Sequence, residues 1–360
     1  FSPYRPFTDI QETGLYIDDI ENSELTYEKK HELNIGIDLG LLENRINFSA
    51  DWYQRNNYDL IGVVPTQGVG GVINKYANVA TMKSHGVEFT LSTRNIRTND
   101  FSWNTDFIFS YAKNEVTQLK GLTSMMELVS GNGFAREGYP VRGLFSIPFA
   151  GLDEDGIPQY LIDGKVTSTS INFQEREKLD YLKYEGPTDP TITGSFGNIF
   201  SYKNFRLNVF MTYSFGNVVR LDPVFKSEYS DLDAMPKEFK NRWTVPGDEA
   251  HTNIPVIAHK RQVQDIPNLK YAYNAYNYSD VRVAKGDFIR MKEISLSYDF
   301  NPAWIKQFKL NNLQLKLQAT NLFLVYSDSK LNGQDPEFFR SGGVASPVPK
   351  QFTLTLRLGL

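Results

Sequence analysis

Residues 351–360 read QFTLTLRLGL, and the pattern of this stretch decides the fold class. Leu354, Leu356 and Leu358 fall on every second position, with Thr and Arg residues between them. A period of two places alternate side chains on opposite faces of a β-strand, so one face of this predicted strand is wholly apolar. In a soluble sheet such a face needs a packed partner layer. The interpretation therefore depends on how many other segments share the pattern and on what their polar faces carry.

The same alternation recurs along the whole chain, in segments such as HELNIGIDLG and LQLKLQATN. It predicts nine strands, and residues 143–160 are compatible with one or two more. The predicted strands are centred on residues 33–39, 46–52, 87–91, 103–111, 194–202, 207–213, 294–300, 313–319 and 352–360. No segment shows a helical period of comparable clarity.

The connections between these strands are of two kinds, which alternate strictly along the chain. Short ones span residues 40–44, 98–100, 203–204 and 301–312, and long ones span about 56–85, 113–193, 214–287 and 322–350. In an up-and-down antiparallel sheet this order puts every short turn at one end and every long loop at the other. Bacterial outer-membrane barrels have short periplasmic turns and longer extracellular loops. Aromatic residues near the ends of the apolar faces suit the interfacial girdles of such barrels: Trp52, Trp103, Tyr111, Tyr213 and Tyr298.

A soluble β-sandwich would also alternate apolar and polar positions. A barrel is favoured because the polar faces mix Asn, Gln, Ser and Thr with charge, as a wet lumen requires, and because the loops are unusually long. The predicted fold class is all-β, an antiparallel up-and-down transmembrane β-barrel. Apolar positions such as Phe48, Phe107, Leu296 and Leu317 should face lipid. The polar residues expected to face the lumen are Asn47, Asp51, Asn104, Asp106, Arg206, Asn208, Glu293, Lys316, Gln318 and Arg357.

Composition argues against several other classes of function. The net charge of −4 disfavours a nucleic-acid partner, and the absence of Cys excludes disulfides and thiolate metal sites. The four His residues are scattered, and the stretch DSKLNGQDPE from Asp328 lacks the bidentate Glu of a calcium loop. The Gly-rich QGVGG from Gln67 and the acidic LDEDG from Leu152 read as turns. No catalytic residue, metal site or cofactor is therefore expected.

The aromatic segment NLKYAYNAYNYSD is the strongest candidate for a contact surface. Its rings offer large contact area at low entropic cost, which suits a sugar or peptide face. The candidates for contact with cargo or with a lid protein are Trp243, Tyr271, Tyr273, Tyr276 and Tyr278. The alternative is that these rings pack a long loop against its neighbours.

Several long motifs, taken in order, resemble one family of proteins. The stretch NSELTYEKKHELNIGIDLGLLENRINFSADWYQRNNYDLI, residues 22–61, is similar to the N-P-x-L-x-W-E, N-x-G-x-D and D-Y-Y motifs of SusC/RagA-type TonB-dependent transporters. NVATMKSHGVEFTL, GDFIRMKEISLSYDF and LQLKLQATNLFLVYSDSKLNGQDPEF match later pieces of that family in the same order. The chain departs at Tyr27, where the family usually has Trp, and at Leu360, where outer-membrane proteins commonly end on an aromatic residue.

This resemblance implies a barrel of about 22 strands with a plugged lumen. It implies import of oligosaccharides or oligopeptides across the outer membrane of Bacteroidetes-type bacteria, under a SusD-like lipoprotein lid. Energy would come from TonB–ExbB–ExbD acting through a plug domain. The whole chain, residues 1–360, is then expected to be the C-terminal part of the barrel domain, with the plug and the remaining strands outside it.

Two other functions remain open from the sequence. One is a complete, passive small porin, in which the first and last strands of this chain would pair with each other. The other is a non-transporting surface binding protein, in which two sheets of a soluble sandwich would share an apolar core.

Overall fold

The computed structural model describes residues 2–4, 14–16, 22–66, 68, 73–132, 136–230, 232–233, 235–308, 310–339 and 348–359. Most of the Gly-rich turn QGVGG and the terminal Leu360 lie outside these ranges. No helix within them is long and apolar enough to cross a membrane.

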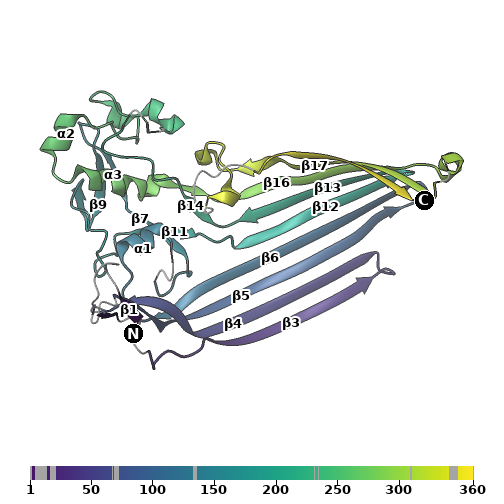
Figure 1. Cartoon of the computed structure of the whole chain (residues 1–360), viewed down its shortest axis with the longest axis horizontal. Helices are drawn as coiled ribbons and strands as arrows, with labels where there is room; N and C mark the ends of the chain where they lie inside the picture. Colours follow the sequence, from purple (N-terminus) through teal and green to yellow (C-terminus); the bar gives the residue numbers. More distant parts are fainter. Residues whose placement is uncertain are drawn as a thin grey trace.

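One nine-stranded antiparallel sheet dominates the molecule, with its strands in the order β18-β17-β16-β13-β12-β6-β5-β4-β3 (Figure 1). These strands are β3 (Lys29–Leu41), β4 (Ile46–Pro65), β5 (Asn74–Arg97), β6 (Phe101–Leu119), β12 (Ile192–Tyr202), β13 (Phe205–Phe215), β16 (Phe288–Asp299), β17 (Asn312–Ser327) and β18 (Gln351–Gly359). Each coincides with one predicted strand, and the up-and-down order is confirmed. The short turns lie at one end of the sheet and the long connections at the other, here called the short-turn end and the long-loop end.

The prediction of a long loop at residues 56–85 is wrong, because the β4–β5 hairpin continues through most of these residues. β4 has 20 residues and β5 has 24, and their pairing reaches Pro65 and Asn74. Register shifts near Leu60 interrupt the alternation, so the sequence pattern stops before the strands do. At about 3.3 Å per residue β4 extends over roughly 66 Å, well beyond the ~30 Å hydrocarbon core of a bilayer. The long-loop end of this hairpin therefore projects past any membrane that the sheet spans.

The register keeps apolar and polar side chains on opposite faces across the sheet. Leu207, Leu296, Leu317 and Leu354 are direct neighbours in one apolar row that crosses four strands. This apolar face is open, since Leu317 is 54% and Leu354 65% exposed. Within the described ranges no second sheet covers this apolar face. The hypothesis of a soluble sandwich with a shared apolar core is therefore wrong.

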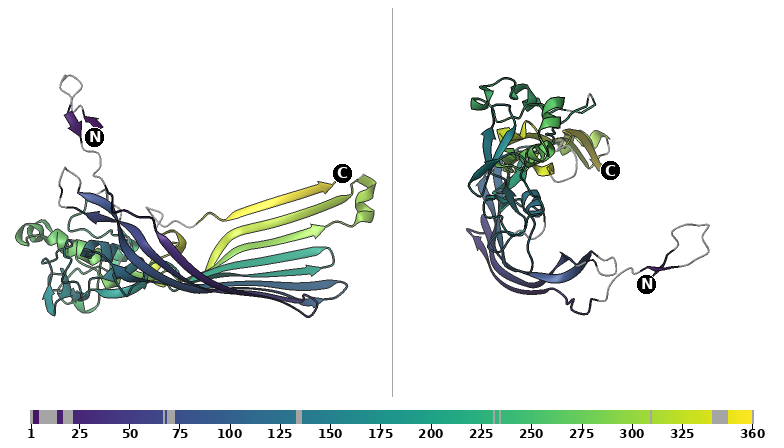
Figure 2. Two further views of the ribbon diagram at one scale, coloured as in Figure 1. Left: turned by 90° about the horizontal axis from the view of Figure 1, so that it is seen from below. Right: turned by 90° about the vertical axis from the view of Figure 1, so that its left-hand side faces the viewer.

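The two edges of the sheet are β3 and β18. β18 pairs along one side with β17, from Asn312 opposite Gly359 to Thr320 opposite Gln351, as an up-and-down strand order requires. β3 pairs with β4 only, among the strands that the structure describes. The pairing of the first and last strands that a small porin requires is therefore not formed, and the sheet is an open, curved wall (Figure 2).

Two of the long connections, residues 120–191 and 216–287, fold together at the long-loop end and are here called the loop subdomain. It contains α1 (Met125–Ser130), β7 (Gly143–Ser146), β8 (Phe149–Leu152), β9 (Pro158–Ile162), β10 (Lys165–Thr167), β11 (Lys183–Pro187), β14 (Val218–Arg220), η2 (Lys237–Asn241), η3 (Asp248–Ala250), α2 (Lys260–Asp265), α3 (Leu269–Asn277), η4 (Asp280–Arg282) and β15 (Val283–Lys285). The third, here called the last loop, carries η6 (Ser329–Leu331) and η7 (Pro336–Phe338). Elsewhere lie the pair β1 (Ser2–Tyr4) and β2 (Gly14–Tyr16), and α4 (Pro302–Ile305) with η5 (Lys306–Phe308).

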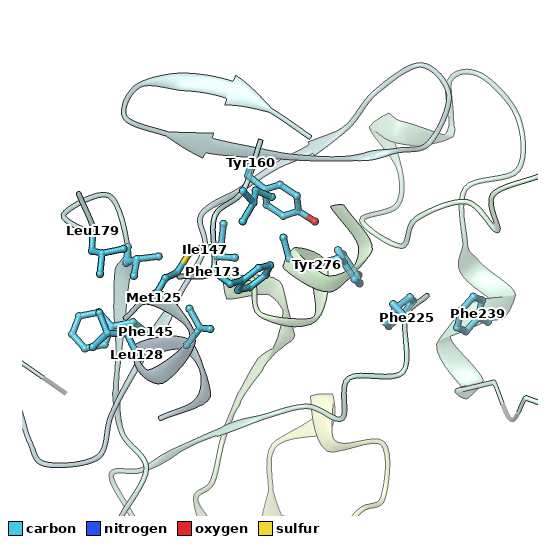
Figure 3. Packing of buried hydrophobic residues seen from close by; sticks show 14 residues of the cluster. Met125, Leu128, Phe145, Ile147, Tyr160, Phe173, Leu179, Phe225, Phe239 and Tyr276 are labelled. Carbon is cyan, nitrogen blue, oxygen red and sulfur yellow. The ribbon is translucent and has the colours of Figure 1, made fainter. Parts of the chain in front are cut away.

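The loop subdomain has a hydrophobic core of its own, to which both connections contribute (Figure 3). Leu128 and Phe145 come from the first connection, and Phe225 and Tyr276 from the second. The rings of Phe225 and Tyr276 meet edge to face at 4.7 Å between centroids. Because each connection buries the other's apolar side chains, the two form one folded unit rather than two separate loops.

Candidate functional site

The polar face of the sheet carries every residue that the sequence predicts to face a lumen. The pairing register brings together on this one face Asn47, Asp51, Asn104, Asp106, Arg206, Asn208, Glu293, Lys316, Gln318 and Arg357. Neighbouring strands are linked on it by side-chain hydrogen bonds, as where the Ser92 hydroxyl donates to Asp106 Oδ1 at 2.6 Å.

Glu293 on β16 is the centre of one such network. Asn208 Nδ2 on β13 donates to its Oε1 at 3.3 Å, and Gln318 Nε2 on β17 donates to its Oε2 at 3.0 Å. Lys316 Nζ lies 3.7 Å from the same carboxylate. The Glu293 carboxylate therefore has polar or cationic partners on both neighbouring strands and is not an isolated charge.

A hollow of about 350 Å³ lies on the polar face near the short-turn end. It is lined by long polar side chains, including Arg206, Asn208, Lys316 and Arg357. In membrane barrels the polar face lines the lumen and the apolar face meets lipid, so the polar face is here called the inner face and the apolar face the outer face.

At the long-loop end, loop segments cover this inner face. The backbone N–H of Val141 donates to Asn114 Oδ1 on β6 at 2.9 Å. From β16, Arg290 Nη2 reaches both carboxylate oxygens of Asp335 in the last loop, at 2.5 and 2.6 Å, and Glu337 Oε2 at 3.1 Å. The Arg290 and Asp335 side chains are 3% and 0% exposed. A buried ion pair therefore fastens the last loop onto the wall.

Arg220 on β14 joins the two connections of the loop subdomain. Its guanidinium donates to the backbone carbonyls of Ser279 at 2.7 Å, Val129 at 3.1 Å and Phe145 at 2.6 Å. Burial lowers the pKa of Arg220 to about 10, which still leaves it charged at neutral pH. These three charge-assisted hydrogen bonds fix the segments against one another.

With this geometry established, comparison with known proteins identifies the family. Residues 4–322 match the family model described as TonB dependent receptor-like, beta-barrel. The chain belongs to this family. TonB-dependent receptors are outer-membrane proteins and are transporters rather than enzymes, in agreement with a sequence that shows no catalytic motif.

Relatives of this TonB-dependent receptor barrel resemble it along nearly its whole length. It is 25% identical over 354 residues to TonB-dependent receptor P3 of Formosa agariphila, covering 93% of this chain and 33% of that one. It is 26% identical over 352 residues to TonB-dependent receptor SusC of Bacteroides thetaiotaomicron, covering 94% and 32%. The solved structure of the RagAB peptide transporter shares its fold, with a TM-score of 0.76, 24% identity and coverage of 99% and 38%. The chain thus spans about a third of the length of these relatives.

The aromatic candidates for cargo or lid contact are mostly inside the loop subdomain of this receptor barrel. Tyr273 and Tyr276 are 1% and 2% exposed, and Tyr273 donates its hydroxyl to the Val256 carbonyl at 2.6 Å. Burial raises the pKa of both phenols well above the ordinary range. Tyr278 is half-buried beside Arg220, and only Tyr271 is exposed. Packing therefore explains Tyr273 and Tyr276, which corrects the expectation that they meet a ligand directly.

Trp243 is also a packing residue, at 8% exposure. Its indole N–H donates to Glu249 Oε2 at 3.0 Å, and its ring lies over Gly156 of the LDEDG turn. Gly156 has φ +74°, and a Cβ there would overlap the indole, so this turn needs glycine both for its backbone and for the ring. The turn predicted at LDEDG is confirmed, and Trp243 pins it to the second connection.

Two structural features at the long-loop end were not predicted from the sequence, the helix α3 and the ion pair Arg290–Asp335. The sequence does contain a periodic pattern that indicates α3. The spacing i, i+3, i+4, i+7 of an apolar helix face is followed by Leu269, Ala272, Tyr273 and Tyr276. No sequence pattern indicates the Arg290–Asp335 pair, because its partners are 45 residues apart and nothing in the local sequence marks either residue as buried.

Proposed function

We propose that this chain forms part of the wall and the mouth of a TonB-dependent importer that carries oligosaccharides or oligopeptides across the outer membrane. The observation that carries the proposal is the combination of an outer apolar face with an inner polar face that folded loops cover at one end only. Such a wall suits a pore that must be wet inside, insulated outside and closable at its mouth.

We infer that the long-loop end is extracellular and the short-turn end periplasmic, as in bacterial outer-membrane barrels generally. The inner face would then line the lumen, and the loop subdomain would stand above the membrane. The long β4–β5 hairpin projects beyond the thickness of a bilayer at this end, which fits the longer extracellular side of such barrels.

The edges of the sheet indicate where the rest of the importer attaches. Each unpaired N–H and C=O in hydrocarbon costs several kcal/mol, so β3 and β18 require partner strands within a membrane. We propose that the remaining barrel strands of the same transporter pair there and that a plug domain fills the lumen. That plug would pass the energy supplied by TonB–ExbB–ExbD.

A SusD-like lipoprotein lid is the proposed partner at the mouth, with residues 224–278 as its contact segment. Because Tyr273 and Tyr276 are buried, we assign the contact to exposed side chains on the outer surface of the loop subdomain instead. Exposed apolar side chains there include Met235 at 44%, Val245 at 57% and Tyr271 at 38%. Met and aromatic residues are enriched in protein–protein interfaces relative to the rest of the surface.

The test replaces these exposed side chains instead of deleting the segment, because deletion would remove Phe225 and Tyr276 from the shared core. The triple variant Met235→Glu, Val245→Glu, Tyr271→Glu is introduced into the full-length transporter. Leu42→Glu, at an exposed short turn, is the control. We expect the triple variant to lose lid co-purification and TonB-dependent growth on the cargo while the control keeps both. If an assembled triple variant keeps both at the control's level, the lid assignment is wrong.

A further inference from the structure

The outer face of the sheet carries one polar patch within its apolar surface. In the row that crosses β5, β6 and β12, Thr93 lies opposite Thr105, and Thr105 lies opposite Asn198. The next position in this row is apolar on either side, with Ile46 on β4 and Val209 on β13. Three neighbouring positions are therefore polar in a row whose flanking positions are apolar.

The rows on both sides of this patch are aromatic. Towards the long-loop end Phe107 lies opposite Phe196, and towards the short-turn end Trp103 lies opposite Phe200. The rings of Trp103 and Phe200 stack at 5.7 Å between centroids. Phe200 is also opposite Leu207 of the apolar row described above, which fixes the patch on the outer face. The polar groups are thus enclosed by apolar and aromatic side chains on the face that meets lipid.

Hydrogen bonds join these polar side chains into one chain. Thr93 Oγ1 donates to Asn95 Oδ1 at 2.8 Å, and Asn95 Nδ2 donates to Thr105 Oγ1 at 2.7 Å. Thr105 Oγ1 in turn donates to Asn198 Oδ1 at 2.8 Å, and Trp103 Nε1 donates to the same oxygen at 2.8 Å. The four residues of this chain that are not aromatic are here called the polar island: Thr93, Asn95, Thr105 and Asn198.

The hydrogen bonds of the polar island leave amide N–H groups unused. Because an indole N–H can only donate, the Asn198 atom that Trp103 meets is the amide oxygen, and Nδ2 points elsewhere. This Nδ2 has no hydrogen-bond partner among the described residues, and it is not one of the unpaired atoms sealed from the surface. Asn95 Nδ2 has a second N–H beyond its bond to Thr105. A donor that faces hydrocarbon finds no water, so the polar island needs a partner that supplies acceptors.

The polar island lies near the level at which a bilayer changes from headgroups to hydrocarbon. Thr105 is four residues along β6 from Phe101, the first residue of the strand after the short turn. At about 3.3 Å per residue and a tilt of about 45°, this distance is roughly 9 Å along the membrane normal. The polar layer of a bilayer is about 5–8 Å thick on each side. The acyl ester carbonyls of phospholipids lie at this boundary, and an ester carbonyl accepts hydrogen bonds but cannot donate them.

We propose that the polar island binds one diacyl phospholipid, whose ester carbonyl accepts an N–H from Asn198 Nδ2. The acyl chains of such a lipid would cover the aromatic rows, while its carbonyls supply the acceptors that the amides lack. The headgroup would point to the short-turn end, which on the orientation proposed above places the lipid in the periplasmic leaflet. The inference concerns the outer face and does not depend on the cargo or on the lid.

The experiment measures phospholipid binding to the full-length transporter, purified in detergent and depleted of lipid. Two lipids are titrated separately: palmitoyl-oleoyl phosphatidylethanolamine, and a diether phosphatidylethanolamine with the same chains, which lacks the carbonyl acceptors. Native mass spectrometry gives the Kd of the first lipid bound. The variant Asn198→Leu removes the amide at similar volume. Asn104→Leu is the matched control, because Asn104 is on the neighbouring strand β6 but on the inner face.

We expect the wild type and Asn104→Leu to bind the diester lipid about fivefold more tightly than Asn198→Leu does. The wild type should bind the diether lipid as weakly as Asn198→Leu binds the diester lipid. Equal affinity of the wild type for the two lipids would overturn the proposal, and this comparison needs no variant to assemble. Equal affinity of the wild type and an assembled Asn198→Leu for the diester lipid would also overturn it. A membrane protein that co-purifies with the wild type but not with Asn198→Leu, without any difference in lipid binding, would assign the polar island to a protein partner instead.

Discussion

The sheet and the loop subdomain differ in whether their apolar side chains are exposed or buried. On the outer face of the sheet Leu354 and Leu356 are 65% and 58% exposed, whereas Leu128 and Phe145 in the loop subdomain are 0% and 1% exposed. The sheet therefore depends on lipid to cover its apolar surface, and the loop subdomain covers its own. One part of the chain is built for hydrocarbon and the other for water, although both contain similar residues.

The two regions meet through polar contacts more than through a shared core. Arg290 on the wall binds Asp335 in the last loop, and Gln334 Nε2 from that loop donates to Asp222 Oδ2 of the loop subdomain at 3.1 Å. Lys330 Nζ donates to the Val283 carbonyl at 3.2 Å. The last loop thus links the lipid-dependent wall to the loop subdomain, through these polar contacts and through Leu331, which packs against Val219 and Leu221 of the loop subdomain.

The largest expected effect comes from breaking that link with Asp335→Ala. Removing one partner of a buried ion pair leaves the other charge uncompensated and costs about 3–5 kcal/mol. We expect hydrogen exchange at residues 328–339 to accelerate strongly while the amides of β16 and the loop subdomain stay protected. Glu337→Ala is the control, because the Glu337 side chain is 40% exposed and its contact with Arg290 contributes at most about 1 kcal/mol. Equal exchange rates in the two variants would show that Arg290–Asp335 does not hold the last loop.

An intermediate effect is expected from placing a charge on each face of β17. Leu317→Arg puts a cation on the outer face and is expected to destabilise the full-length barrel in a bilayer by about 2–4 kcal/mol. Gln318→Arg puts the same charge on the inner face, beside Glu293, and should be nearly neutral. Urea unfolding from lipid vesicles, followed by tryptophan fluorescence, measures both. A larger loss for Gln318→Arg than for Leu317→Arg would reverse the assignment of the two faces.

The smallest effect concerns pH and is confined to the loop subdomain. Burial raises the pKa values of Tyr181, Tyr184 and Tyr229 to about 12. The unfolded chain releases these protons near pH 10, so the stability they contribute is fully present below pH 10 and falls as pH rises from 10 towards 12. Near-ultraviolet absorbance of tyrosinate should show a late-titrating group of tyrosines in the folded protein that disappears in denaturant. Titration of all tyrosines near pH 10 in the folded protein would contradict the packing described for this region.

The period-two alternation of residues 33–39, 207–213, 313–319 and 352–360 was enough to predict the strands, their order and the division into an apolar and a polar face. A strand's side-chain direction is a local property, so each segment carries this information by itself. The long motifs between residues 22 and 338 were enough to indicate the family. The length of the β4–β5 hairpin was not predicted, because bulges shift the register and hide the period.

The tertiary structure alone decided which aromatic rings are core and which are surface. Tyr271 and Tyr273 are two residues apart on α3, yet one is 38% and the other 1% exposed, because the first connection packs on only one side of that helix. The Arg290–Asp335 pair, the three carbonyls around Arg220 and the hydrogen bonds that Asn198 accepts likewise depend on residues far apart in the chain. Burial and pairing of that kind are set by how whole segments pack, and no local period of the sequence records them.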